Sequence, residues 1–143
     1  MDHAEYVYTR GMTDEEVDER LEAESHGVLA LADGDDAYAL PLSHHYDGDR
    51  LLLRVSVHEH AEKVRYLETT DTATFVCYDA TEEGSWSVHV RGPIAPSDVE
   101  IDDTTLNEWF PPFRLFDEEV AEVEFVLYEL GTESVTGRTT LGE

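Results

Sequence analysis

Short stretches of alternating apolar and polar residues recur along the chain, and this period of two is typical of β-strands that bury one face. Between residues 50 and 57, apolar side chains occupy the odd positions from Leu51 to Val57. Between residues 85 and 91, Trp86, Val88 and Val90 alternate with polar side chains. Runs of this kind predict six strands, at residues 26–32, 37–46, 50–57, 72–78, 85–91 and 121–130.

Local signals for turns and helices separate the predicted strands. Residues 33–36 (Asp-Gly-Asp-Asp) and 47–49 (Asp-Gly-Asp) have the chemistry of hairpin turns. Thr13 followed by Glu16 is a capping box and predicts a helix at residues 13–24, and further helices are expected at residues 59–68 and 101–110. Pro41 cannot donate to a strand ladder, so it indicates an edge or a bulge. Gly92-Pro93 is expected to break or bend the strand that precedes it.

Strands joined by hairpins, with few helices between them, are typical of an antiparallel barrel or sandwich. We therefore expect a mainly β protein, a six-stranded antiparallel barrel with two or three flanking helices. No linker, internal repeat or low-complexity tract divides the sequence, so residues 1–143 are expected to form a single domain.

The charge balance is extreme, because 34 Asp and Glu residues against 9 Lys and Arg residues give a net charge of −25. Such a chain repels a nucleic-acid backbone and an anionic membrane alike, so neither is an expected partner. The aromatic content of 10% and the strand patterns argue against a disordered acidic chain. At molar salt the screening length falls to about 3 Å, so dense surface carboxylates cost little there. We therefore expect a protein from an extreme halophile.

Three features bear on the compartment. No apolar run approaches the length of a membrane helix, and the acidic residues 1–5 lack the layout of a signal peptide. The single cysteine, Cys77, cannot form an internal disulfide, and it lies in an apolar run that favours burial. We expect a cytoplasmic protein.

Lys63 is the only lysine among the nine basic residues, so its retention is notable. The predicted third strand carries Arg54 and Ser56, and the helix that follows carries Lys63 in its first turns. A phosphate dianion is bound by such charged donors together with the positive end of a helix. The alternative is an ordinary ion pair between Lys63 and Glu59, four residues earlier, and spacing alone does not decide between the two.

The seven histidines and an aromatic cluster have weaker functional signals. His58 and His60, or His44 and His45, could suggest a metal site, but neighbouring strand residues point to opposite faces. Polar or stacking roles are the main interpretation, with a metal or haem ligand as alternatives. The cluster is expected in a core or a dimer face, or as the wall of a flat ring ligand; it comprises Trp109, Phe110, Phe113 and Phe116.

Several short motifs occur in an order known from one family. Residues 26–30 (His-Gly-Val-Leu-Ala) precede residues 38–43 (Tyr-Ala-Leu-Pro-Leu-Ser) and the Tyr-Asp-Gly-Asp of residues 46–49. Residues 51–56 with Lys63, residues 86–92 and residues 136–138 follow. In this order the chain resembles the pyridoxamine 5′-phosphate oxidase-like family of FMN-binding split β-barrels, especially its short branch near the nitroimidazole-resistance flavoproteins.

The resemblance implies a homodimer with FMN at the subunit interface. Arg54 and Lys63 would then engage the FMN phosphate. Ser87 or His89 would come from the neighbouring subunit, and Arg138 would close the site. The residues implied along the isoalloxazine ring and its pocket are Pro41, Leu42, Ser43, His44, Val55 and Ser56.

The resemblance also implies a flavoprotein, and we expect an oxidoreductase that accepts hydride from NADH or NADPH and delivers it to a small acceptor. The sequence has no P-loop, no dinucleotide glycine fingerprint and no nucleophile elbow. No side chain identifies itself as a general acid or base, so the catalytic residues are unassigned, with His44 the candidate nearest the ring. The alternatives are a non-catalytic flavin or haem carrier on the same barrel and a deazaflavin-dependent reductase.

The charge of −25 predicts that stability depends on salt. The carboxylates repel one another in dilute buffer and are screened at molar KCl, so the unfolding midpoint is expected to rise with KCl concentration. Thermal unfolding followed by circular dichroism over a KCl series checks this. A midpoint that stays constant or falls would contradict the halophilic interpretation.

Overall fold

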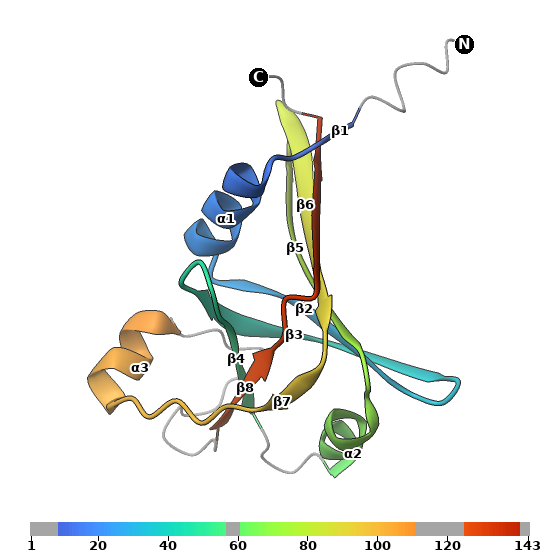
Figure 1. Cartoon of the computed structure of the whole chain (residues 1–143), viewed down its shortest axis with the longest axis vertical. Helices are drawn as coiled ribbons and strands as arrows, with labels where there is room; N and C mark the ends of the chain where they lie inside the picture. The colour runs from blue at the N-terminus through green and yellow to red at the C-terminus, as the bar shows by residue number, and fades with distance from the viewer. Residues whose placement is uncertain (1–8, 57–60, 111–124, 141–143) are drawn as a thin grey trace.

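The computed structural model of the chain describes residues 9–56, 61–110 and 125–140, with the backbone alone at residues 61, 62 and 103. Within these ranges the chain forms nine strands and three helices, most of which are labelled in Figure 1. The strands are β1 (Arg10–Gly11), β2 (His26–Asp33), β3 (Asp36–Tyr46), β4 (Leu51–Ser56), β5 (Ala73–Thr81), β6 (Gly84–Gly92), β7 (Ile94–Pro96), β8 (Phe125–Leu130) and β9 (Ser134–Thr139). The helices are α1 (Asp14–Ala23), α2 (Ala61–Thr69) and α3 (Asp103–Trp109).

All strand pairs are antiparallel, in the order β1-β9-β6-β5-β2-β3-β4-β8-β7. Only Pro93 separates β6 from β7, and only residues 131–133 separate β8 from β9. Because β6 pairs with β9 and β7 pairs with β8, these four segments form one bent two-stranded ribbon that joins both ends of the sheet. The result is a closed barrel of six long strands, which confirms the predicted mainly β fold, with β1 added at the edge.

The ribbon bends where two glycines meet. A Cβ atom on Gly92 would lie 2.0 Å from the carbonyl oxygen of Gly131, a distance that no side chain can adopt. The amide of Gly131 donates a 2.8 Å hydrogen bond to the carbonyl of Pro93. The predicted break at Gly92-Pro93 is therefore the corner at which the barrel closes.

Alternating side chains fill the barrel. Leu29, Leu53, Phe75 and Val88 come from four different strands and are fully buried in one core. This arrangement follows from the period of two seen in the sequence, since odd positions on β2, β4 and β5 all face inward.

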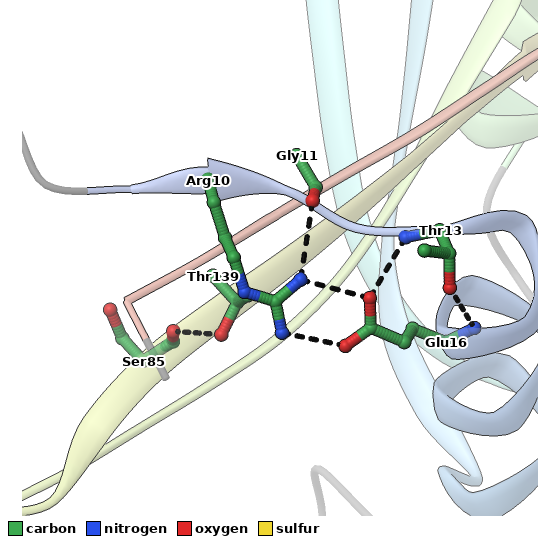
Figure 2. A network of polar contacts seen from close by, with 6 residues as sticks. All are labelled: Arg10, Gly11, Thr13, Glu16, Ser85 and Thr139. Atoms are coloured by element: carbon green, nitrogen blue, oxygen red, sulfur yellow. Dashed lines mark hydrogen bonds and ion pairs between the residues drawn. The ribbon is translucent and has the colours of Figure 1, made fainter. Parts of the chain in front are cut away.

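The two longer helices cover opposite ends of the barrel (Figure 1). The helix α1 begins with the predicted capping box between Thr13 and Glu16 and buries Val17 and Leu21 in the core. Arg10 adds two hydrogen bonds to the Glu16 carboxylate, as Figure 2 shows, and these contacts hold the pKa of Glu16 at about 2. At the other end α2 lies on β2, with Tyr66 stacked on Tyr38 at 5.1 Å between ring centroids.

One element differs from the sequence prediction. Residues 136–138, which were not predicted as a strand, belong to β9, whose alternation is hidden because its central inward position is Gly137. Met12 and Val17 fill the space that a side chain at this position would take. The last long strand begins at Phe125 in the described part, while residues 57 and 121–124 lie outside it.

Pro41 lies where β3 has only one paired neighbour. It is opposite Val28 of β2, whereas the pairing of β3 with β4 starts at Ser43. The predicted edge at Pro41 is therefore local, because β3 has a paired strand on both sides at Ser43. None of the described helices is long and apolar enough to span a bilayer.

Candidate functional site

The residues predicted to hold a ligand divide between the two faces of the barrel wall. Leu42, His44 and Val55 point inward and are buried in or against the core. A ligand outside the barrel can therefore meet only the backbone of these three residues. The predicted residues on outward positions are Pro41, Ser43, Arg54, Ser56, Ser87 and Arg138.

Arg54 is a buried cation on the outer face of β4. Its Nη1 donates a 3.0 Å hydrogen bond to the carbonyl of Phe110, and its guanidinium carbon lies 3.6 Å from the ring centroid of Phe125. Its Nε is buried and has no hydrogen-bond partner among the described residues. Burial lowers the pKa of the guanidinium, because the charged form is desolvated.

Lys63 lies in the first turn of α2 and is only 8% exposed. Its Nζ donates a 2.5 Å hydrogen bond to the carbonyl of Ser56, which brings the lysine to the end of β4. Burial lowers the pKa of this ammonium group for the same reason as at Arg54. Glu59, the alternative ion-pair partner, lies outside the described residues.

These two cations differ from the arginines that form ion pairs with described carboxylates. Arg10 pairs with Glu16, Arg50 with Glu129 and Arg65 with Asp33, and all three of these arginines are more exposed. Neither Arg54 nor Lys63 forms an ion pair with a described carboxylate. Desolvated charges without counter-ions are costly, so an anion at this place would relieve the cost.

Ser43 and Ser56 complete this region. Ser43 lies directly opposite Arg54 in the pairing of β3 with β4, and Ser56 is two residues beyond Arg54 on the same face. Two residues along a strand span about 7 Å, so Arg54 and the lysine bound at Ser56 can flank one small anion. We call Ser43, Arg54, Ser56 and Lys63 the cation site.

Ser87 and Arg138 lie elsewhere on the barrel. They are opposite each other in the pairing of β6 with β9. Arg138 is exposed and donates hydrogen bonds to Thr9. Within one chain, the structure does not bring this pair to the cation site.

The outward positions of β2, β3, β5, β6 and β9 lack Asp and Glu, although the chain has 34 acidic residues. Small apolar side chains occupy the middle of this surface, and Tyr78 is 63% exposed there. We call this surface the acid-free face. Its central residues are Val28, Ala30, Ala39, Pro41, Val76 and Tyr78, and its basic residues include His89, Arg91 and Arg138.

His44 has a structural environment of its own. Its side chain is 1% exposed, packs edge-on against Phe75 and has Nε2 2.9 Å from the carbonyl of Leu21. A carbonyl only accepts, so Nε2 carries the proton and satisfies an unpaired carbonyl of the last turn of α1. Burial lowers the pKa of His44 to about 4.

The short helix α3 covers the outer face beside the cation site. The ring of Trp109 stacks in parallel on His45 with centroids 4.1 Å apart, and Phe110 is fully buried. The sequence placed Trp109 and Phe110 in a core, a dimer face or the wall of a ring ligand, but it did not reveal their contacts with His45 and Arg54. Phe113 and Phe116 lie outside the described residues, as do His58 and His60.

Two other features lie away from the cation site. A cleft of about 340 Å³ lies between α1 and the end of β9, with Arg10, Glu16 and Arg20 among its lining residues. In the described ranges, no group of three or more His, Cys, Asp or Glu side chains is placed to hold a metal ion. Cys77 is buried in the core as expected, and burial raises the pKa of its thiol to about 12.

Comparisons with known proteins identify the family. The family model for pyridoxamine 5′-phosphate oxidase matches residues 13–139, so the chain belongs to this family. The search of curated proteins gives no match. The predicted relationship to the oxidase-like split barrels is thus confirmed.

Solved structures share the fold at low identity. A candidate pyridoxamine 5′-phosphate oxidase from Corynebacterium glutamicum is 19% identical, with a TM-score of 0.68 over 100% of this chain and 98% of that one. An FAD-binding protein from Mesorhizobium loti is 20% identical, with a TM-score of 0.65 over 92% and 97%. A candidate 5-nitroimidazole resistance protein from Bacteroides thetaiotaomicron is 15% identical, with a TM-score of 0.58 over 92% and 87%.

The lowered pKa of His44 predicts a pH-dependent stability. The folded state holds the His44 imidazole neutral. The contribution of this neutral side chain to the unfolding free energy is therefore complete above the unfolded pKa of about 6.5, and it is lost as the pH falls toward 4. Between pH 7 and about pH 4.5, the wild type should lose about 2 kcal/mol more unfolding free energy than His44→Gln. Urea unfolding of both proteins at constant molar KCl measures this difference.

The matched control is His89→Gln, which removes an exposed histidine from β6. It is expected to lose the same unfolding free energy as the wild type over this pH range. A wild type and His44→Gln with parallel pH profiles would show that His44 is not held neutral by the fold.

Proposed function

We propose that the chain binds FMN and places its phosphate at the cation site. The observation that carries this proposal is the burial of Arg54 and Lys63 without a described carboxylate partner, in a chain of net charge −25. The large negative net charge of the chain disfavours anions in general, so a site with two desolvated cations favours the binding of one.

The donors at this site suit a phosphate dianion. The buried Nε of Arg54 has no described partner and offers a charge-assisted bond. Lys63 lies in the first turn of α2, where backbone amides have no partner within the helix and the helix dipole favours negative charge. Lys63 also has two further ammonium protons besides the one donated to Ser56.

The flavin ring extends from the cation site along the outer face of β3. Pro41 and Ser43 contribute side chains there, while Leu42, His44 and Val55 contribute backbone groups, because their side chains belong to the core. The FAD-binding protein from Mesorhizobium loti shares this fold and supports a flavin as the ligand class. FMN rather than FAD is proposed because FMN ends in a phosphate dianion, which suits two adjacent cations, whereas each phosphate of FAD is a diester with a single charge.

We further propose a homodimer with the flavin at the interface. Two chains of charge −25 repel each other strongly, and the acid-free face is where this repulsion is smallest. Its apolar centre gives burial on association. Ser87, His89 and Arg138 lie on this face. They are far from the cation site of their own chain, so they would reach the flavin bound to the other subunit of the dimer.

The proposed activity is that of an oxidoreductase in a reducing cytoplasm. Bound flavin supplies hydride acceptance from NADH or NADPH and delivery to a small acceptor. The side chains of the cation site bind and orient the cofactor. His44 keeps its Nε2 proton on Leu21, so this histidine supports the fold and exchanges no proton with a substrate.

Lys63→Ala tests the phosphate site. Loss of a charge-assisted contact should weaken FMN binding by about 1.5–3 kcal/mol, or about 10- to 150-fold. Fluorescence titration of apoprotein with FMN in molar KCl measures the affinity.

Arg65→Ala is the matched control, because Arg65 lies on the same helix but pairs with Asp33 at the surface. Its affinity for FMN should equal that of the wild type. If both substitutions weaken binding equally, the effect is one of overall charge and the assignment of Lys63 to the phosphate is wrong.

The absorption spectrum of the purified protein separates the alternatives. Flavin bands support the proposal, whereas a Soret band without flavin would favour the haem carrier. Of the candidate haem ligands, His44 is committed to the core and His89 is exposed, while His58 and His60 lie outside the described residues. A cofactor with a deazaflavin spectrum would favour a deazaflavin-dependent reductase.

Reduction by a nicotinamide distinguishes an enzyme from a carrier. Mixing FMN-loaded protein with NADH or NADPH under anaerobic conditions should bleach the flavin bands at a rate that saturates with nicotinamide concentration, because the donor must first bind. Stopped-flow absorbance measures this rate, with free FMN as the control. A protein-bound flavin reduced no faster than free FMN with either donor would leave a carrier as the better interpretation.

A further inference from the structure

We infer that α3 positions Arg54 for its anion, and that the stack of Trp109 on His45 is the contact that holds α3 in place. This inference rests on the proposed anion site, and it adds positioning residues that do not touch the ligand. It follows from a chain of contacts that begins on β3 and ends at the Arg54 guanidinium.

The guanidinium of Arg54 is fixed from two sides. The Phe125 ring lies against its face at 3.6 Å, and the Phe110 carbonyl accepts from its Nη1 at 3.0 Å. A planar group with one face and one edge fixed has little rotational freedom, so the direction of its remaining N–H groups is also fixed. The unsatisfied Nε–H is thus aimed before any anion binds.

The carbonyl of Phe110 has this role because of its place in α3. Phe110 is the C-cap residue, and its own amide donates to the carbonyl of Leu106. Carbonyl groups at a helix C-terminus lack partners within the helix and carry the negative end of its dipole. Arg54 therefore binds a carbonyl whose position depends on the docking of the whole helix.

The helix cannot hold that position alone. It has seven residues, and isolated helices of this length are unstable in water, so a tertiary contact must fix it. Besides the buried Phe110 at its end, the helix contacts His45, whose ring is parallel to Trp109 at 4.1 Å. His45 lies next to His44 on β3 and pairs with Leu52, two residues before Arg54 on β4. One pair of adjacent strands thus carries both the support of α3 and the arginine.

A double-mutant cycle tests the coupling. Trp109→Ala should weaken FMN binding about 10-fold in the wild-type background, since the arginine loses its orientation, and less than about 2-fold in an Arg54→Gln background. Trp109→Phe retains an aromatic stack and should restore near-wild-type affinity. Thr104→Ala, at an exposed position on the same helix, is the control and should leave affinity unchanged.

His45→Ala removes the same stack from the strand side, which covers the case in which Trp109→Ala does not fold. It should weaken FMN binding by the same factor and add nothing further when combined with Trp109→Ala. Equal losses from Trp109→Ala in the wild-type and Arg54→Gln backgrounds, or no loss at all, would overturn the inference.

An NMR measurement without FMN separates this inference from the proposed function. The buried Nε–H of Arg54 should give a side-chain signal protected from solvent exchange in the wild type, in Trp109→Phe and in Thr104→Ala, and an unprotected one in Trp109→Ala. A signal protected equally in Trp109→Ala would contradict the positioning role even if FMN binds. Failure of the wild type to bind FMN would instead contradict the proposed function, whatever this signal shows.

Discussion

The structure depends on the closure of its sheet at the corner where Gly92 meets Gly131. Neither glycine has a side chain, so the two backbones can approach closely at this point. The two strands therefore bend together there and join the ends of the sheet. Closure removes most free strand edges and gives every strand residue an inner or an outer position. The inner positions make one core, which α1 and α2 cover at its two ends. Ligands must therefore bind outside the barrel wall.

On the outer side, charge becomes the second constraint. A chain of net charge −25 keeps carboxylates away from one broad surface, the acid-free face, and keeps two buried cations without a described carboxylate beside it. Each of these features is costly for an isolated chain, the first through exposed apolar area and the second through desolvation. Both costs are relieved together if an anionic cofactor and a second copy meet at this surface. The proposed function is the simplest arrangement that accounts for both.

The contacts around Arg54 show how a site of this kind is organised. Two segments far apart in sequence converge on one guanidinium: Phe110 at the end of α3 and Phe125 at the start of β8. Neither of them carries a compensating charge. The arginine is oriented by a helix carbonyl and an aromatic ring while its charge stays available, which is what recognition of an anion requires.

The order of residues along the chain was enough to predict most strands, the capping box of α1 and the corner at Gly92-Pro93. These features depend on local periodicity, local hydrogen bonding and composition, all of which can be read from neighbouring residues. The order of residues could not reveal β9, because the central inward position of that strand is Gly137. The side chains that fill the space there, Met12 and Val17, come from the other end of the chain. Nor could the order of residues decide that His44 points into the core while Ser43 points outward, or that Trp109 supports Arg54 through Phe110. Which face of a strand is buried, and which distant groups meet a buried charge, are decided only when the barrel closes.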